Sequence, residues 1–199
     1  MATTQLALPS AGGSGAGAEE RRSTLPLAVL VGGLGVLSLV GGLVAAYLAL
    51  KAAPGRFVPD KTDYDNYTAS TLTLTALMAM VTVEWAIYGI RKGFRGQALF
   101  AYGITTLLGV AFLNALYYLI TQLRFEVASS AYAGVVTAML VVAFGVIVLG
   151  LLAVILTALR AVGHQLTTDN LHVARAGALA WHIAAVAWVA VYYTVYITK

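Results

Sequence analysis

The chain has 199 residues, of which 60% are hydrophobic and 10% are charged, and its mean hydropathy is +0.86. Soluble domains carry charge on roughly a quarter of their residues, so this composition excludes an ordinary water-soluble domain and predicts an integral membrane protein. The absence of cysteine excludes disulfide frameworks, thiolate metal sites and thioether attachment of haem. The formal charge of +4 comes without a face rich in Lys or Arg, so nucleic acid is not expected as a partner.

The first 24 residues differ in character from the rest of the chain. They are rich in Gly, Ser and Ala and include the charged run EERR. Such a composition buries too little apolar area to offset the entropy of ordering the backbone. We therefore predict a flexible polar tail over residues 1–24 and a membrane domain over residues 25–199.

Five apolar runs follow the tail, at about 25–50, 69–90, 98–120, 131–161 and 174–197. Each run is long enough to cross a hydrocarbon layer of ~30 Å as a helix, which takes about 20 residues. The predicted fold class is therefore all-α, an integral membrane protein with a bundle of five transmembrane helices.

The distribution of basic residues predicts the orientation, because short loops rich in Lys and Arg stay on the cytoplasmic side. With the amino terminus inside, the inner side carries seven Lys and Arg residues and the outer side carries five. Three of the inner ones, Arg91, Lys92 and Arg95, lie in the short RKGFRG loop. We expect a cytoplasmic amino terminus and a carboxyl terminus on the outside.

Small residues recur every four positions in the first run, at Ser38, Gly42 and Ala46. Helices associate within a bilayer where small side chains let two backbones approach closely. The stripe either receives a neighbouring helix or reflects the general abundance of Ala and Gly in this chain, and the sequence leaves both interpretations open.

Three polar side chains fall at membrane depth, namely Glu84, Asn114 and His182. A charge at the centre of a spanning helix costs about 2.5–3.5 kcal/mol on insertion scales, so a buried carboxylate is expected to be paired, neutralised or functional. Glu84 lies about two helical turns before Arg91, near the inner surface. It is either one station of a proton path or, as we favour, a paired or snorkelling side chain.

His182 is a poor candidate for a haem ligand, because no second histidine lies within any apolar run. A hydrogen bond to another helix is the favoured interpretation, with Glu84 as a candidate partner. The polar segment ahead of the last run offers Thr167, Thr168 and Asp169 as possible caps of that helix. The chain contains no nucleotide-binding, hydrolase or metalloprotease motif, so no catalytic, cofactor-binding or metal site of its own is expected.

Three segments carry a family resemblance. Residues 81–88 read VTVEWAIY and are followed by GFR at 93–95, residues 105–109 read TTLLG, and residues 180–188 read AWHIAAVAW with Tyr196 eight residues further on. These segments resemble the patterns V-[ST]-[IV]-T-W-A-H-H with G-[DN]-R, T-x-x-L-G, and Y-W-H-F-V-D-V-V-W with a later Tyr, of subunit III of the haem–copper cytochrome c oxidases. The register holds over about residues 70–197, and GLVAAY at 42–47 is similar to the family's G-L-F-A-A-Y.

The family includes a short bacterial form with five helices, which agrees with the number of apolar runs. At nearly every position where the family has a buried ionisable side chain, however, this chain has an apolar residue or one of opposite charge. The positions concerned are Val36, Leu119, Ala143, Val146, Arg175 and Ala185. A role that depends on protonating the family's first carboxylate is therefore not expected to carry over.

The resemblance implies an accessory subunit III that binds no cofactor itself, with haem in a partner subunit I and copper in a partner subunit II. It also implies a subunit that stabilises the catalytic subunit, holds structural phospholipid and supports proton uptake during aerobic electron transport in a bacterial plasma membrane. The packing or interface candidates that follow from it are Trp85, Trp181, His182, Trp188 and Tyr196, to which the residue analysis adds Glu84 and the stripe Ser38, Gly42 and Ala46.

Three alternatives remain open at this point. The first is an accessory subunit of a nitric oxide reductase or quinol oxidase. The second is a small transporter in which Glu84, Asn114 and His182 line a path, although its prolines lie outside the run interiors and five spans do not divide into two inverted halves. The third is a purely architectural subunit of a larger respiratory or photosynthetic assembly.

Overall fold

The described part of the chain is almost entirely helical. The structure is a computed structural model that describes residues 14–54, 65–123, 127, 129–167 and 170–198, with side chains from Thr24 onward. Its elements are α1 (Ser14–Ala52), α2 (Asn66–Arg91), α3 (Arg95–Thr121), α4 (Ala131–Val162), α5 (His172–Tyr192) and a π-helical turn η1 (Tyr193–Ile197). Five of these helices are long and apolar enough to cross a membrane, which confirms the predicted all-α fold with five candidate spans.

Helix α1 extends beyond the predicted first span at its amino-terminal end. It begins at Ser14, so it includes part of the segment expected as a polar tail, and it contains Pro26 in its interior. Ala, Glu and Arg are favourable residues within a helix, which accounts for its continuation through the EERR run. Residues 1–13 of the predicted tail lie outside the described residues.

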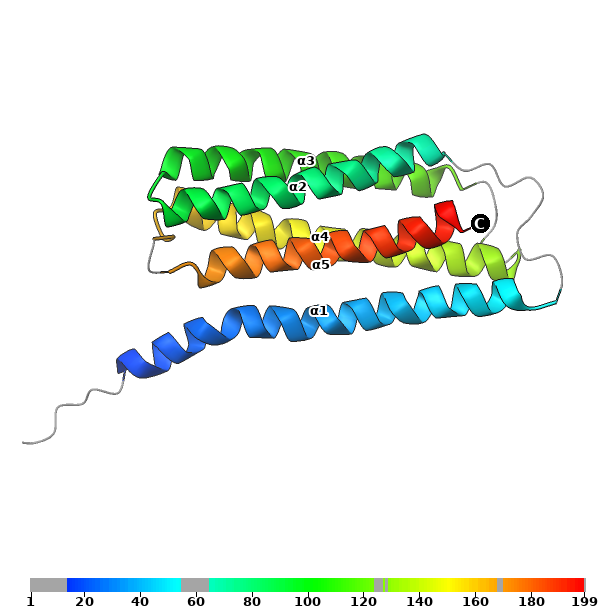
Figure 1. Cartoon of the computed structure of the whole chain (residues 1–199), viewed down its shortest axis with the longest axis horizontal. Helices are drawn as coiled ribbons and strands as arrows, with labels where there is room; N and C mark the ends of the chain where they lie inside the picture. The colour runs from blue at the N-terminus through cyan, green and yellow to red at the C-terminus, as the bar shows by residue number, and fades with distance from the viewer. Residues whose placement is uncertain (1–13, 55–64, 124–126, 128, 168–169, 199) are drawn as a thin grey trace, which may run out of the picture.

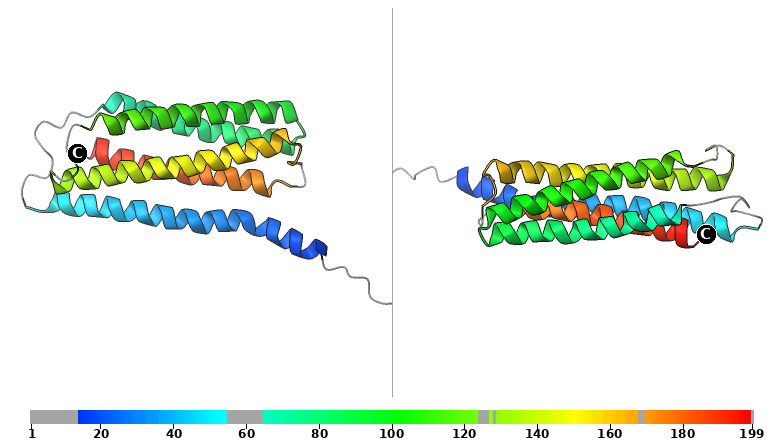
Figure 2. Two further views of the ribbon diagram at one scale, coloured as in Figure 1. Left: turned by 180° about the vertical axis from the view of Figure 1, so that it is seen from behind. Right: turned by 90° about the horizontal axis from the view of Figure 1, so that it is seen from above.

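The helices are arranged in three tiers, with α2 and α3 on one side, α4 and α5 in the middle and α1 on the other side (Figures 1 and 2). Helix α5 packs against α1, α2 and α4, whereas α1 packs mainly against α4 and α5. The last helix is therefore the central element of the bundle and the first helix is peripheral.

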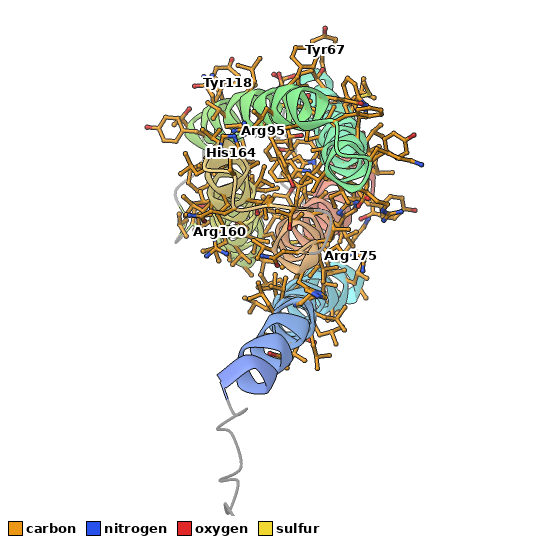
Figure 3. The ribbon with its side chains drawn as sticks, turned by 90° about the vertical axis from the view of Figure 1, so that its left-hand side faces the viewer. Tyr67, Arg95, Tyr118, Arg160, His164 and Arg175 are labelled. Atoms are coloured by element: carbon orange, nitrogen blue, oxygen red, sulfur yellow. The ribbon has the colours of Figure 1, made fainter. Side chains whose placement is uncertain are left out.

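Basic residues gather at one end of the bundle. The amino-terminal part of α1, the α2–α3 turn and the α4–α5 connection lie together at this end, and the carboxyl terminus lies at the opposite end (Figure 1). We call this the basic end; the described residues that define it are Arg91, Lys92, Arg95, Arg160 and Arg175, of which three are labelled in the end-on view of Figure 3. Among the described residues the opposite end has only Lys51 as a basic side chain.

Tyrosines gather at the opposite end, at the carboxyl ends of α1, α3 and α5 and at the start of α2 and α4. These residues are Tyr47, Tyr67, Tyr117, Tyr118, Tyr132, Tyr192, Tyr193 and Tyr196. Tyrosine is enriched where a bilayer meets water, because its ring is apolar and its hydroxyl is polar. The tyrosine-rich end and the basic end are thus of different character, as the two faces of a membrane protein often are.

Polar contacts fix the connections at the basic end. Gly93 has a φ of +76°, which lets the chain reverse between α2 and α3, and the Phe94 amide donates to the Gly89 carbonyl at 2.8 Å. Arg95 then donates to the Val162 carbonyl at 2.7 Å and contacts the His164 ring, so the two connections at this end are joined.

Polar side chains cap α2 and α4, at positions that were not predicted from the sequence. Asp65 caps α2 by accepting from the Thr68 amide at 2.9 Å, and Ser130 caps α4 by accepting from the Ala133 amide at 3.1 Å. Leu171 occupies the capping position of α5, with no capping hydrogen bond from its side chain, so the expectation that Thr167 caps this helix is wrong. Thr168 and Asp169 lie outside the described residues.

Candidate functional site

An aromatic column runs along the buried face of α5 and into η1. Trp181, Trp188 and Tyr196 are all buried, with exposed fractions of 0%, 0% and 3%. The Trp188 indole donates to the Thr73 hydroxyl of α2 at 3.0 Å, and its ring meets Phe112 of α3 edge to face at 5.3 Å. Three of the residues predicted for packing therefore fill the interior of this chain and tie α5 to α2 and α3.

One member of this column, Tyr192, is not among the residues predicted from the sequence. Tyr192 stacks on Tyr196 with ring centroids 5.9 Å apart and lies 6.5 Å from the Trp188 ring. Its hydroxyl also lies 3.0 Å from the Ser70 hydroxyl of α2. The spacing of four residues from Trp188 to Tyr192 and on to Tyr196, which places all three on one helical face, was the signal that could have identified it.

Two glycines on α3 and α4 allow close packing around Trp181 and its neighbours. A Cβ added at Gly150 of α4 would lie 2.9 Å from the Ala184 Cβ and 3.4 Å from the Ala180 carbonyl oxygen, so α4 and α5 approach closely there. A Cβ added at Gly109 of α3 would lie 2.6 Å from a Leu151 methyl group and 3.4 Å from the Trp181 ring. These close approaches are the kind of contact through which helices associate inside a bilayer.

Trp85, by contrast, lies on the outer surface of the chain. Its exposed fraction is 38%, and its ring makes an edge-to-face contact with Phe100 of α3 at 6.1 Å. Of the predicted tryptophans it is therefore the one whose position suits contact with lipid or with another chain.

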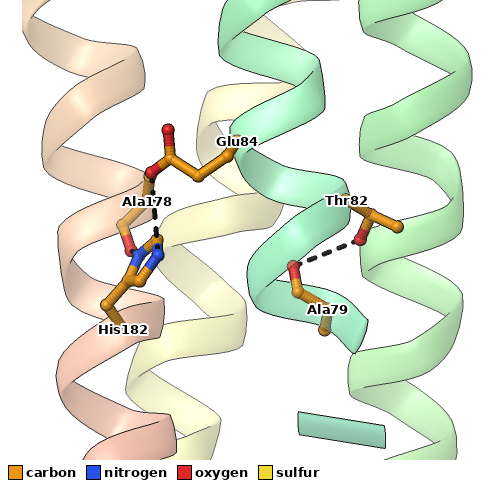
Figure 4. Close-up of polar contacts among 5 residues, drawn as sticks. All are labelled: Ala79, Thr82, Glu84, Ala178 and His182. Atoms are coloured by element: carbon orange, nitrogen blue, oxygen red, sulfur yellow. Dashed lines mark hydrogen bonds and ion pairs between the residues drawn. The ribbon is translucent and has the colours of Figure 1, made fainter. Parts of the chain in front are cut away.

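Glu84 and His182 come together across α2 and α5, as the sequence predicted (Figure 4). The His182 Nε2 atom lies 3.6 Å from a Glu84 carboxylate oxygen, which is an ion-pair contact rather than a short hydrogen bond. The His182 Nδ1 atom lies 2.6 Å from the Ala178 carbonyl oxygen. Because a carbonyl only accepts, Nδ1 carries a proton, and the contact with the carboxylate is attractive when the pair holds one further proton.

An open groove of about 440 Å³ surrounds this pair at the basic end, and we call it the charged groove. Its polar lining consists of Glu84 and Arg91 from α2 and Arg175 and His182 from α5. Its apolar lining comes from all three adjoining helices and consists of Pro26, Ile87, Ala178 and Leu179. Two guanidinium groups thus open onto the same space as the ion pair. Nothing in the positions of Arg91 and Arg175 along the chain predicts that they share one site.

The remaining candidates do not converge on this groove. Asn114 is exposed on α3 and lies near the opposite end of the bundle from Glu84. Ser38, Gly42 and Ala46 are exposed on α1, and a Cβ added at Gly42 has no neighbour within 4 Å among the described atoms. No neighbouring helix of the described chain receives the small-residue stripe, and Asn114 does not share a site with Glu84 and His182.

Helix α1 packs through a different face. Its buried residues, Gly33, Val40 and Tyr47, recur every seven positions. Tyr47 contacts the ring of Tyr132 on α4 at 6.1 Å. Within the described residues, no group of three or more His, Asp or Glu side chains is arranged to hold a metal ion.

These features define a class: a small helical membrane protein with a tightly filled interior, a charged groove at its basic end and a peripheral first helix. A family model described as cytochrome c oxidase subunit III matches residues 69–199. The chain belongs to the cytochrome c oxidase subunit III family. A comparison with curated proteins gives no match.

The match confirms the resemblance seen in the sequence over the last four spans. It takes in nearly all of α2 and the whole of α3, α4 and α5, and so includes the aromatic column and the α2 and α5 residues of the charged groove. Helix α1, with its small-residue stripe, lies outside the matched range.

Proposed function

We propose that this chain is an accessory subunit of a respiratory haem–copper oxidase that binds neither haem nor copper itself. It packs beside a haem-bearing subunit I in a complex that also contains a copper-centre subunit II. The observation that carries the proposal is the family match over residues 69–199. The filled interior supports it, because Trp181 and Trp188 occupy the space at the centre of the bundle that a large prosthetic group would need.

Its proposed work is to stabilise the catalytic subunit, to hold phospholipid and to support proton uptake during aerobic electron transport. The aromatic column and the close contact between α4 and α5 at Gly150 favour a rigid bundle, against which a catalytic subunit can pack. The charged groove supplies an opening at the basic end that Glu84 and His182 line.

The proposed orientation has the basic end in the cytoplasm of a bacterium and the tyrosine-rich end outside. Among the residues that the structure describes, five basic ones lie at the first end and Lys51 lies at the second. Positive charge on the cytoplasmic side and tyrosine at the interface favour this orientation. The membrane domain then comprises residues 25–199, in the plasma membrane, with a cytoplasmic amino terminus and an external carboxyl terminus.

The residues proposed to contact partners are those that the described chain leaves exposed. Trp85 lies on the surface formed by α2 and α3, and the stripe Ser38, Gly42 and Ala46 lies on α1. Small residues that meet nothing within their own chain are suited to close approach by a helix of another chain.

Gentle extraction of the native complex tests the proposal, with mass spectrometry of the co-isolated chains and an optical spectrum of the same sample. We expect a haem-bearing subunit and a copper-centre subunit to accompany this chain. A haem-bearing complex without a copper-centre subunit indicates a nitric oxide reductase or quinol oxidase instead. Isolation of the chain without partners, or with haem bound to its own side chains, contradicts the proposal.

A further inference from the structure

One side chain joins the two connections at the basic end. The Arg95 guanidinium donates to the Val162 carbonyl at 2.7 Å and contacts Nε2 of the His164 ring, just beyond the end of α4 (Figure 3). Arg95 is the first residue of α3, so these contacts tie the α2–α3 turn to the end of α4. Arg95 and His164 are both exposed, which gives protons from the aqueous phase direct access to the imidazole.

The contact between Arg95 and His164 requires a neutral imidazole. A guanidinium group has five N–H donors and no acceptor, and it stays protonated in proteins. The Nε2 atom of His164 therefore accepts the hydrogen bond, and the proton of the ring lies on Nδ1. Protonation of Nε2 removes the acceptor and places a second positive charge beside Arg95. Histidine is the side chain whose charge ordinarily changes between pH 5 and 8.

The backbone of His164 has a conformation that glycine favours. Its φ of +57° lies in the left-handed region, which other L-residues adopt at a cost. The Gln165 amide donates to the Arg160 carbonyl at 2.9 Å and the His164 amide donates to the Ala161 carbonyl at 3.3 Å, a pattern with which many helices end. Glycine is the usual residue at this position, so an imidazole here points to a use for the ring beyond ending the helix.

The charges around His164 do not compensate a protonated ring. On the adjoining elements at this end, the described side chains that carry or gain charge between pH 5 and 8 are basic, namely Arg91, Lys92, Arg95, Arg160, His172 and Arg175. Of the described acidic side chains, Asp65 lies at the opposite end, and Glu84 lies seven residues, or about 10 Å, deeper than Arg91. Asp169 lies outside the described residues.

We propose that Arg95 and His164 form a proton-sensitive latch, which holds the α2–α3 turn against the end of α4 while the imidazole is neutral and releases it when the imidazole gains a proton. A cavity of about 110 Å³ lies between the joined segments, with Gly93 and Arg95 among its lining on one side and Leu166 and Thr167 on the other. Release of the latch lets these segments separate around the cavity. The inference goes beyond the proposed function and rests on contacts within this chain; only the placement of the latch in the cytoplasm depends on the proposed orientation.

The test is amide hydrogen–deuterium exchange of the extracted complex at about pH 8 and about pH 5.5, on either side of the ordinary titration of histidine. Each rate is divided by the intrinsic rate of an unfolded chain at the same pH. In the wild type we expect the protection of peptides covering residues 92–98 and 161–167 to fall at least fivefold at the lower pH. Peptides from the middle of α3 should keep their protection and serve as the internal reference.

H164Q is the decisive variant, because the side-chain oxygen of glutamine can accept from Arg95 and does not titrate. It should give the same protection at both pH values. H164K carries a positive charge at both pH values and should give low protection at both. The matched control is H172Q, which removes the histidine that begins α5 and should keep the wild-type response.

Four results overturn the latch: a wild type without a pH response, a response that persists in H164Q, high protection in H164K, or an equal loss of the response in H172Q. The subunits present in the same sample report separately on the proposed function. Partner subunits without a pH response leave the oxidase assignment standing. A pH response in a chain isolated without partners contradicts that assignment and leaves the latch standing.

Discussion

The first and last helices show how differently two apolar segments of one chain can be used. In its most apolar window α5 has 50% of its residues buried inside the structure, whereas α1 has 11%. The family match includes α5 and leaves α1 out. Over these windows the less buried segment, that of α1, is nevertheless the more apolar one. Lipid is as apolar as a protein core, so in a membrane apolar character alone does not tell an interior helix from a peripheral one.

The buried faces of the two helices explain the contrast. Helix α5 is buried through many small residues, including Ala174, Ala178, Ala184 and Ala185, which allow three other helices to approach it. Helix α1 is buried along a single narrow line that includes Val40 and Tyr47. We therefore expect damage to α5 to disturb the whole bundle and damage to the exposed face of α1 to leave the chain intact.

The largest effect is expected from truncating the aromatic column. Trp188→Ala should lower the free energy of unfolding by about 3–5 kcal/mol, because it leaves a cavity and removes the indole hydrogen bond to Thr73. Trp85→Ala is the matched control, because that ring is 38% exposed, and it should have a clearly smaller effect. Unfolding by SDS in mixed micelles measures both, and similar losses in the two variants contradict a central role for the column.

A second comparison sets Gly150 on α4 against Gly42 on α1. Gly150→Leu should destabilise the chain by about 1–3 kcal/mol, because a Cβ there already meets Ala184 of α5. Gly42→Leu should change stability by less than about 0.5 kcal/mol, because nothing in the described chain lies within 4 Å of its added Cβ.

The same Gly42 variant sharpens the proposal for the α1 stripe. If this face meets another subunit, Gly42→Leu should reduce co-isolation of that subunit while the chain itself unfolds as the wild type does. Unchanged co-isolation means that the stripe faces lipid. A matched substitution at Gly35, also exposed on α1 with nothing within 4 Å, controls for a larger side chain in this helix.

Much of the fold follows from the sequence because the thickness of a bilayer sets how many apolar residues a spanning helix needs. The predicted spans 98–120 and 131–161 lie within three residues of α3 (Arg95–Thr121) and α4 (Ala131–Val162). The pairing of Glu84 with His182 was also predictable, since two polar side chains at the same depth in a bilayer are more stable in contact with each other than with lipid.

Other features depend on how each helix is rotated about its axis and on the register between neighbouring helices, which an apolar run does not encode. The outward position of Ser38 and Gly42 is one example, because small residues suit either a protein contact or a lipid contact. The meeting of Arg91 with Arg175 is another, because they lie on helices that are far apart in the sequence. Likewise, Ser70 and Tyr192 come together only through the register of α2 against α5.

A smaller effect is expected at the Glu84–His182 pair. A double-mutant cycle of Glu84→Gln and His182→Leu should give a coupling energy of about 0.6 kcal/mol, the average for interhelical polar contacts in a membrane. Partial exposure of both side chains limits this coupling energy.

His182→Leu should weaken association with the partner subunit without shifting a haem band. A shifted or bleached haem band in an intact complex contradicts the assignment of His182 to a contact between helices.

The smallest effect is expected at the amino-terminal cap of α2, outside the membrane. The hydroxyl and amide of Thr68 hydrogen-bond to the Asp65 carboxylate and hold the pKa of that carboxyl below its ordinary value of 3.8. A carboxyl whose pKa is lower in the folded state stabilises that state at neutral pH, and the contribution is lost as pH falls below 3.8 through the folded-state pKa.

Amide exchange in the first turn of α2, from Tyr67 to Ser70, should therefore accelerate in Asp65→Ala at pH 7. Asp65→Asn, which keeps an acceptor for the Thr68 amide, should retain most of the protection and lose the acid-dependent change. Equal exchange rates in the wild type and Asp65→Ala mean that packing against the neighbouring helices, not the cap, holds the start of this helix.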